Sequence, residues 1–200
     1  MKREIWFDMD GTIANLYGVD GWLNDLINED VRPYAVARPL INMQVLARVL
    51  NRLIKNGWAI GIVSWTSKNG TIEYNEKVAE VKKNWLKKHL ASVEFSAIKV
   101  IEYGTPKSIV MNDKNAILFD DEVNNRNEWN GIAYDVNNIL EVLKGLEREV
   151  KMFKTIVLII FVFVLVVDFM FELVKEKINI FDLILRAFMV VSFCFLSLSF

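Results

Sequence analysis

The sequence predicts an α/β fold, a Rossmann-like parallel sheet with helices on both faces, followed by an apolar tail. Short apolar runs alternate with longer segments of helical periodicity through about residue 150, which is typical of a parallel sheet covered on both faces. Beyond that point, residues 155–200 hold only seven charged side chains, whereas residues 1–154 hold 21 basic and 21 acidic ones. We therefore expect a folded domain over 1–150 and a membrane anchor over 151–200.

Each expected strand is a short apolar run bounded by polar residues or glycine. The first is Ile5-Trp6-Phe7, and the second, Trp58-Ala59-Ile60-Gly61-Ile62-Val63, follows the stop signal Asn56-Gly57. Further strands are expected at 98–101, 116–119 and 132–134. Ligands of parallel sheets bind at the carboxyl ends of strands, so we expect the chemistry of this chain there.

The expected helices repeat apolar residues at three- and four-residue spacing, which places these residues on one helical face. The repeat covers 40–56, which Asn56-Gly57 ends, and 72–90, a charged segment with one apolar face. A third helix is expected over 137–149, where it leads into the tail.

Composition narrows the possible chemistry. A net charge of -1 lacks the basic excess of nucleic-acid-binding proteins, so no stable nucleic-acid complex is expected. The single cysteine, Cys194, excludes an intramolecular disulfide and a thiolate zinc cluster. The single histidine, His89, excludes a site built from several histidines. Catalysis would therefore depend mainly on carboxylates, hydroxyls, lysines and backbone amides.

The first strand ends in Asp8-Met9-Asp10-Gly11-Thr12. Asp8 leaves the strand end as a possible nucleophile, and Asp10 lies on the following turn, where it could reach a leaving-group oxygen. Neighbouring carboxylates repel each other unless a cation or a shared proton compensates, so Mg²⁺ is expected. Gly11 allows a sharp turn beside a phosphate. The alternative is a solvated acidic turn.

Further polar side chains that could bind a phosphate or Mg²⁺ lie after other expected strands or at a helix start. Ser64 follows the second strand, where its hydroxyl could donate to a phosphoryl oxygen or merely cap a turn. Lys107 stands at an expected helix start, where it could neutralise a phosphate or hold the paired carboxylates, or simply be solvated. Asp120 and Asp121 follow the strand 117–119 and could complete a Mg²⁺ site with Asp8, or form a solvated acidic loop.

The chain carries these features in the order acid pair, hydroxyl, lysine and second acid pair. With this order it resembles the haloacid dehalogenase superfamily of phosphohydrolases over roughly residues 3–145. The motif Phe7-Asp8-Met9-Asp10-Gly11-Thr12-Ile13 is the most specific element of the resemblance. Within the superfamily the chain looks most like the 5′(3′)-deoxyribonucleotidase group and its phage and bacterial relatives. The supporting segments are Tyr74-Asn75-Glu76-Lys77 with Trp85, and Lys107-Ser108-Ile109-Val110 before Leu118-Phe119-Asp120-Asp121.

The resemblance implies a role for each motif. Asp8 would attack phosphorus and form an aspartyl-phosphate, and Asp10 would protonate the leaving alkoxide and then deprotonate water. Ser64 and Lys107 would hold the phosphoryl group, with Thr66 as the alternative hydroxyl. Mg²⁺ would be held by Asp8, the Asp10 backbone carbonyl and Asp121, with Asp120 as the alternative to Asp121.

Substrate choice in this superfamily comes from the insert after the first motif, which here is residues 15–39 and is called the cap below. We expect Trp22 to stack on a base and Arg38 to bind a phosphate or carboxylate, alongside Thr12 and Thr66. The alternative is that the apolar side chains of the cap only pack it onto the domain.

The tail holds two apolar segments, 155–174 and 178–200, which predict a hairpin of transmembrane helices turning at 175–177. Asp168 and Arg186 would lie at matching depth and pair. A buried core helix is the alternative, because neither segment has 18 residues without a charge. Lysines and arginines before the first span outnumber those in the turn, and no signal peptide opens the chain, which together favour a cytoplasmic catalytic domain.

These observations predict a membrane-anchored, Mg²⁺-dependent phosphatase acting on a small phosphorylated substrate, in the first place a nucleotide. The same chemistry would also suit a sugar phosphate, a lipid-linked phosphate or a nucleic-acid end. A non-catalytic, membrane-anchored binding or scaffold protein is the alternative from another functional class.

Overall fold

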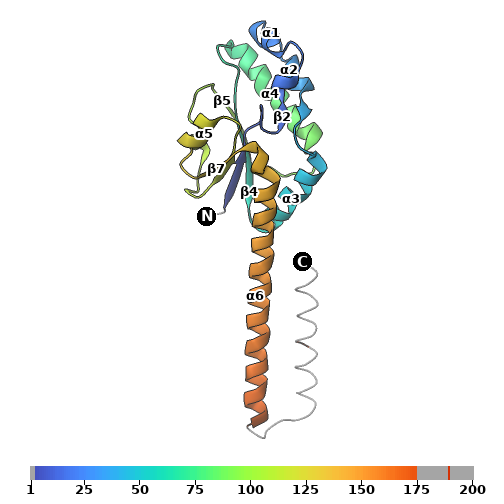
Figure 1. Cartoon of the computed structure of the whole chain (residues 1–200), viewed down its shortest axis with the longest axis vertical. Helices are drawn as coiled ribbons and strands as arrows, with labels where there is room; N and C mark the ends of the chain where they lie inside the picture. Colours follow the sequence, from blue (N-terminus) through green and yellow to red (C-terminus); the bar gives the residue numbers. More distant parts are fainter. Residues whose placement is uncertain (1–2, 175–188, 190–200) are drawn as a thin grey trace. The chain divides into compact units, whose positions relative to one another are not determined.

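The computed structural model describes residues 3–174 and residue 189 (Figure 1). The chain divides into two compact units, Met1–Glu147 and Arg148–Phe200. The first contains the sheet and the candidate site, and the second contains most of a long apolar helix.

The first unit is built on a five-stranded, all-parallel sheet in the order β5-β4-β1-β6-β7. The strands are β1 (Glu4–Phe7), β4 (Ala59–Trp65), β5 (Ala97–Ile101), β6 (Ile117–Phe119) and β7 (Ile132–Tyr134). The predicted α/β parallel sheet is therefore confirmed. Phe7 at the end of central β1 is in register with Ile62 of β4 and Phe119 of β6. This register brings the residues that follow the three strands to one edge of the sheet.

Alternation along β1 divides the core between the two sheet faces. Ile5 and Phe7 pack on the face covered by α3 (Met43–Lys55), α4 (Ile72–His89) and the first turns of α6 (Ile139–Val174). Trp6 points to the other face, which is covered by η2 (Lys107–Val110) and Trp129 at the end of α5 (Val123–Glu128). Figure 1 shows α3 and α5 on opposite sides of the sheet.

Side-chain caps set the helix starts. Asn42 accepts hydrogen bonds from the backbone N–H groups of Gln44 and Val45, so α3 begins at Met43 and not at residue 40 as the periodicity predicts. Thr71 caps α4 in the same way through the N–H of Tyr74, and the predicted helix 72–90 agrees with Ile72–His89.

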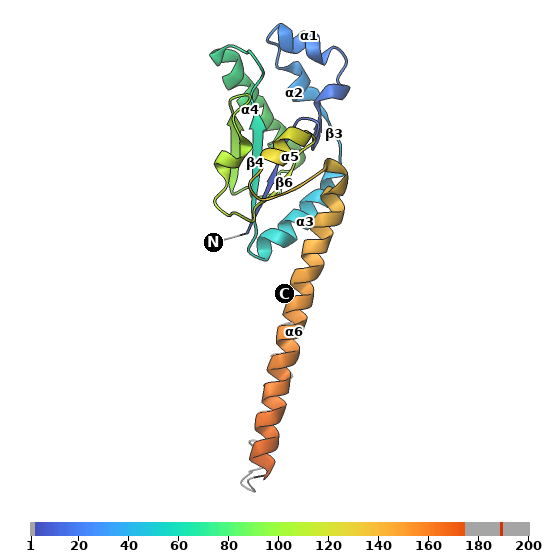
Figure 2. The same cartoon turned by 60° about the vertical axis from the view of Figure 1, so that its left-hand side comes forward.

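The cap is small and mostly helical. It contains η1 (Leu16–Gly18), α1 (Trp22–Ile27) and α2 (Arg32–Val36), and two short strands, β2 (Ala14–Asn15) and β3 (Arg38–Pro39), pair antiparallel across its base. Leu16 and Tyr34 pack against Tyr74 and Val78 of α4. Figure 2 shows β4 pointing towards the end of the unit that carries α1 and α2. The cap therefore lies beside the carboxyl end of the sheet.

Helix α6 is continuous from Ile139 to Val174, whereas the sequence predicts one helix over 137–149 and another over 155–174. The intervening residues, 150–154, are Val, Lys, Met, Phe and Lys, with no proline or glycine to end the helix there. The stretch Val136–Phe171 is long and apolar enough to cross a membrane, and none of its most apolar part is buried. The second predicted span at 178–200, its turn at 175–177 and Arg186 lie outside the described residues.

Candidate active site

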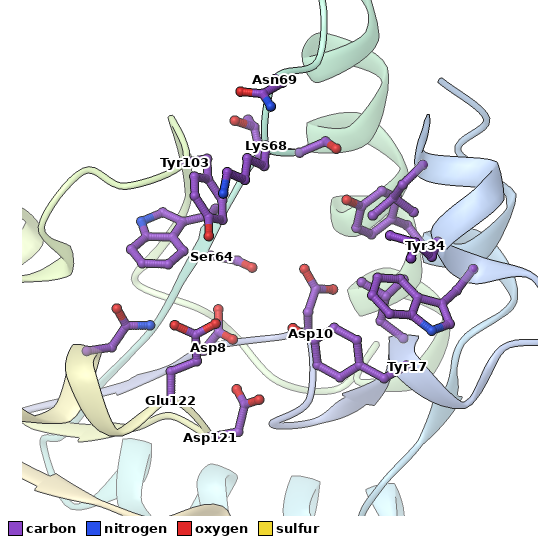
Figure 3. Close-up of a pocket in the computed structure, with 18 of the residues that line it drawn as sticks. Asp8, Asp10, Tyr17, Tyr34, Ser64, Lys68, Asn69, Tyr103, Asp121 and Glu122 are labelled. Atoms are coloured by element: carbon purple, nitrogen blue, oxygen red, sulfur yellow. The ribbon is translucent and has the colours of Figure 1, made fainter. Parts of the chain in front are cut away.

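The predicted strand-end residues line one cavity of about 410 Å³ at the carboxyl edge of the sheet. Asp8 follows β1, Ser64 lies near the end of β4, and Asp121 follows β6. Figure 3 shows Asp8, Asp10 and Ser64 between Tyr17 and Tyr34 of the cap on one side and Lys68 and Tyr103 on the other. The parallel register explains this convergence, because all three strands end at the same edge.

Lys107 forms a buried ion-pair cluster with two of the acids. Its Nζ lies 2.9 Å from Oδ1 of Asp8 and 2.7 Å from Oδ2 of Asp120, and all three side chains are almost completely buried. Burial alone opposes the lysine charge, but the Asp8 and Asp120 carboxylates outweigh it and raise the pKa of Lys107. The ammonium is therefore held charged beside the proposed nucleophile.

Asp120 is fully buried and is hydrogen-bonded on several sides. Besides Lys107, its carboxylate accepts hydrogen bonds from Asn125 Nδ2 at 3.1 and 3.2 Å and from the backbone N–H of Glu122 at 2.9 Å. Burial and the charge of Asp8 raise the pKa of Asp120, although Lys107 acts against both. These bonds hold the loop after β6, which also carries Asp121.

Thr12 orients Asp121. Its hydroxyl donates to Oδ1 of Asp121 at 3.2 Å and accepts from the backbone N–H of Asp121 at 3.1 Å. Thr12 is buried and is not among the residues that line the cavity, and its hydroxyl contacts Asp121. Gly11 makes this approach possible, because a Cβ there would lie 2.2 Å from Oδ2 of Asp121.

Three carboxylates meet at this edge in a group that suits a divalent cation. Asp8, Asp120 and Asp121 each offer an oxygen, and these atoms lie within 4.8 Å of one another. Burial, followed by the charges of Asp8 and Asp120, raises the pKa of Asp121 to about 7. Hard oxygen donors and mutual repulsion are the features that Mg²⁺ would satisfy. The residues therefore fit the metal that the sequence resemblance implies.

Asp10 lies on the turn after β1 and points into the cavity (Figure 3). Its carboxylate Oδ2 is 2.5 Å from Nζ of Lys82, a residue of α4. Burial raises the pKa of Asp10, and the charge of Lys82 offsets part of that effect. A carboxyl group with a raised pKa can hold a proton and give it to a leaving group.

The sequence interpretation missed Lys82. Its side chain is 1% exposed and lies on the apolar face of α4, one helical turn from Val78 and Trp85. A lysine on an otherwise apolar face is a usable signal, because burying a charged group is costly unless a partner compensates it. The partner, Asp10, comes from a distant part of the sequence.

The predicted substrate contacts divide into two groups. Trp22 and Thr66 line the cavity, and the hydroxyl of Thr66 is buried with no hydrogen-bond partner in the described part of the chain. Arg38 is not among the residues that line the cavity; it pairs with Asn15 in the β2–β3 ladder, and its side chain is exposed.

Aromatic rings form both side walls of the cavity. In the cap, Tyr17 meets Trp22 edge to face with ring centroids 5.1 Å apart, and both line the cavity. On the other wall Trp65 and Tyr103 lie 4.9 Å apart, and Lys68 approaches the Tyr103 ring at 5.6 Å.

No protein-family model matches the chain, and no curated protein matches it. Among solved structures, the chain is similar to a D,D-heptose 1,7-bisphosphate phosphatase from Burkholderia thailandensis, with 12% identity and a TM-score of 0.39 over 63% of this chain and 70% of that one. A likeness at this level assigns neither family nor activity.

Proposed function

We propose that this protein is a Mg²⁺-dependent phosphatase of the haloacid dehalogenase type that hydrolyses phosphomonoesters. The observation that carries the proposal is the buried contact of Lys107 with Asp8 and Asp120 at the floor of a cavity that Asp10, Ser64 and Asp121 also line. A carboxylate flanked by a fixed cation and further acids suits attack on phosphorus better than it suits a binding surface.

Asp8 acts as the nucleophile. One of its carboxylate oxygens forms a bond to phosphorus while the bond from phosphorus to the leaving oxygen breaks, which produces an aspartyl-phosphate. Asp10 gives its proton to the leaving oxygen. In the second step Asp10 takes a proton from water, whose oxygen attacks phosphorus and releases Asp8 and inorganic phosphate. Lys107 and the Ser64 hydroxyl hold the phosphoryl oxygens throughout.

Asp8, Asp121 and the Asp10 backbone carbonyl would hold Mg²⁺, with Asp120 as the alternative carboxylate. The ion would supply positive charge beside the phosphoryl oxygens. Thr12 and Gly11 contribute by keeping Asp121 close to Asp8.

A nucleotide is the proposed substrate. The two aromatic walls, formed by Tyr17 and Trp22 on one side and by Trp65 and Tyr103 on the other, suit stacking with a base. A lipid-linked phosphate is the second candidate, because α6 is long and apolar enough to hold the chain at a membrane.

The anchor is proposed to comprise residues 151–200, with its two spans at 155–174 and 178–200, and the phosphatase domain, residues 1–150, is proposed to lie in the cytoplasm. The excess of basic residues before the first span supports this orientation.

The test uses the full chain in detergent. Phosphate release is measured with 5′-nucleoside monophosphates, glucose 6-phosphate, glycerol 3-phosphate and phosphatidic acid, in Mg²⁺ and in EDTA. We expect Mg²⁺-dependent release that falls at least about 1,000-fold in Asp8→Asn and is unchanged in Asp20→Asn, an exposed aspartate outside the cavity. Release that survives Asp8→Asn, or no release from any substrate, would contradict the proposal and favour the scaffold alternative.

A further inference from the structure

Lys82 is a second buried lysine of the site, and all of its donors are used. Its Nζ donates to Oδ2 of Asp10 at 2.5 Å, to Oγ of Ser64 at 3.0 Å and to the backbone carbonyl of Trp65 at 2.6 Å. A lysine ammonium carries three protons and no acceptor. These three bonds therefore leave Lys82 no donor for a substrate.

Lys82 also lies behind the cavity wall. It is 1% exposed and is not among the residues that line the cavity, whereas both Asp10 and Ser64 line it. Lys82 would therefore act through these two residues. The protein carries the desolvation cost of a buried ammonium here, which is offset by three hydrogen bonds and, once Asp10 has given up its proton, by the ion pair with its carboxylate.

The bond to Ser64 fixes the direction of the serine hydroxyl. A hydroxyl has one proton and two lone pairs, and Lys82 occupies a lone pair of Ser64 Oγ. The hydroxyl proton must then point away from the ammonium. Because Ser64 lines the cavity, this proton is available to a phosphoryl oxygen.

The bond to Asp10 fixes the carboxylate of the acid–base residue. Asp10 lies on the turn after β1, and its carboxylate points into the cavity (Figure 3). Lys82 lies in the middle of α4, and its Nζ donates to Oδ2. The ring of Tyr34, a cap residue, lies 4.9 Å from the same ammonium and limits its movement.

We propose that Lys82 is a positioning residue for phosphoryl transfer, which holds the Asp10 carboxylate at the leaving-group oxygen and turns the Ser64 hydroxyl proton towards the phosphoryl group. This inference rests on the proposed phosphatase function. It predicts a dependence on the leaving group, because only Asp10 acts on the leaving oxygen whereas Ser64 acts on every phosphomonoester.

The test compares kcat/KM of the full chain for two substrates. One is p-nitrophenyl phosphate, whose leaving group needs little protonation, and the other is the fastest alkyl phosphate among 5′-nucleoside monophosphates, glucose 6-phosphate and glycerol 3-phosphate. We expect Lys82→Met to lower kcat/KM about 100-fold on the alkyl phosphate and about 10-fold or less on p-nitrophenyl phosphate. Lys83→Met, an exposed neighbour on the same helix, should leave both values unchanged.

A double-mutant cycle then separates positioning from general damage. The quantity compared is the ratio of kcat/KM on the alkyl phosphate to kcat/KM on p-nitrophenyl phosphate. If Lys82 acts through Asp10, this ratio should be the same in the double variant of Lys82→Met and Asp10→Asn as in Asp10→Asn alone. This double variant has no unpaired carboxylate to destabilise it, so it serves even if Lys82→Met alone does not fold. An unchanged ratio in folded Lys82→Met, or a further tenfold change of the ratio in the double variant, would overturn the inference.

The controls distinguish this inference from the proposed function. If the wild-type chain hydrolyses both substrates and Lys82→Met has the same kcat/KM values, only the inference about Lys82 is contradicted and the phosphatase function stands. A wild-type chain that hydrolyses neither would contradict the phosphatase function and the inference together.

Discussion

The Lys107 ammonium lies 2.9 Å from Oδ1 of Asp8, and the two side chains bury each other. Asp8 follows the central strand β1, whereas Lys107 opens η2 on the connection between β5 and β6. The contact therefore joins two distant segments at the carboxyl edge of the sheet. Without Lys107, the buried carboxylates at this edge would repel one another with no cation to compensate them.

Replacing Lys107 by Met should both inactivate and destabilise the protein. Asp8 and Asp120 would lose their shared cation while remaining buried, which costs about 3–5 kcal/mol for a broken buried pair. Urea unfolding in EDTA and phosphate release measure the two effects. Lys114→Met, at an exposed lysine on the same connection, should change neither. Equal unfolding midpoints for the two variants would contradict the buried pair.

Mg²⁺ should stabilise the protein more at pH 8 than at pH 6. The raised pKa of Asp121, about 7, means that the folded chain holds an extra proton below pH 7. Without metal, the stability gained from that proton is lost as pH rises from the ordinary carboxyl range through 7. A cation competes with the proton, so its binding strengthens over the same range.

Thermal unfolding with and without Mg²⁺ at the two pH values measures this effect. Asp121→Asn should abolish most of the Mg²⁺-dependent shift at pH 8. A shift of equal size at pH 6 and pH 8 in the wild-type chain would show that no carboxyl group with a raised pKa takes part in metal binding.

Gly11→Ala should weaken the response to Mg²⁺. The backbone of Gly11 has φ of 74°, and a Cβ would lie 2.2 Å from Oδ2 of Asp121, so Asp121 must move. Gly57→Ala is the matched control, because Gly57 also has positive φ, 87°, but its Cβ would meet nothing within 4 Å. Both variants bear a backbone cost of about 1 kcal/mol.

Only Gly11→Ala should therefore raise the Mg²⁺ concentration needed for half-maximal activity, by about tenfold for a loss of about 1.4 kcal/mol. If the two glycine variants show the same Mg²⁺ dependence, Asp121 does not serve as a ligand.

Phe163→Arg should reduce membrane retention. Phe163 is exposed in the middle of the apolar stretch of α6, where an arginine costs about 2.5–3.5 kcal/mol on insertion. Met152→Arg, nearer the basic start of the stretch, should have little effect. Alkaline extraction of membranes separates inserted from peripheral protein. Wild-type chain recovered in the soluble fraction would contradict the membrane anchor.

The strand-end residues could be predicted because their signal is local. An apolar run such as Ile117-Leu118-Phe119 defines a strand, and in a parallel sheet the polar residue after it falls at the carboxyl edge. The register of β1 with β4 and β6 then brings Asp8, Ser64 and Asp121 to one cavity.

The contacts of Lys82, Thr12 and Arg38 could not be predicted, because each depends on packing between distant segments. Lys82 reaches Asp10 only because α4 packs behind the turn after β1. The Thr12 hydroxyl contacts Asp121, and Arg38 has an exposed side chain that does not line the cavity. The spacing of residues within one segment does not predict such contacts between distant segments.

The most direct test of the account asks whether Asp8 takes up the phosphoryl group. Asp10→Asn protein is mixed with p-nitrophenyl phosphate. Its p-nitrophenolate group leaves without protonation by an acid, whereas hydrolysis of the aspartyl-phosphate needs the base that this variant lacks. We predict a rapid burst of one p-nitrophenol per protein and a phosphate on the peptide that contains Asp8. An active wild-type chain whose Asp10→Asn variant gives neither a burst nor a labelled peptide would contradict the account.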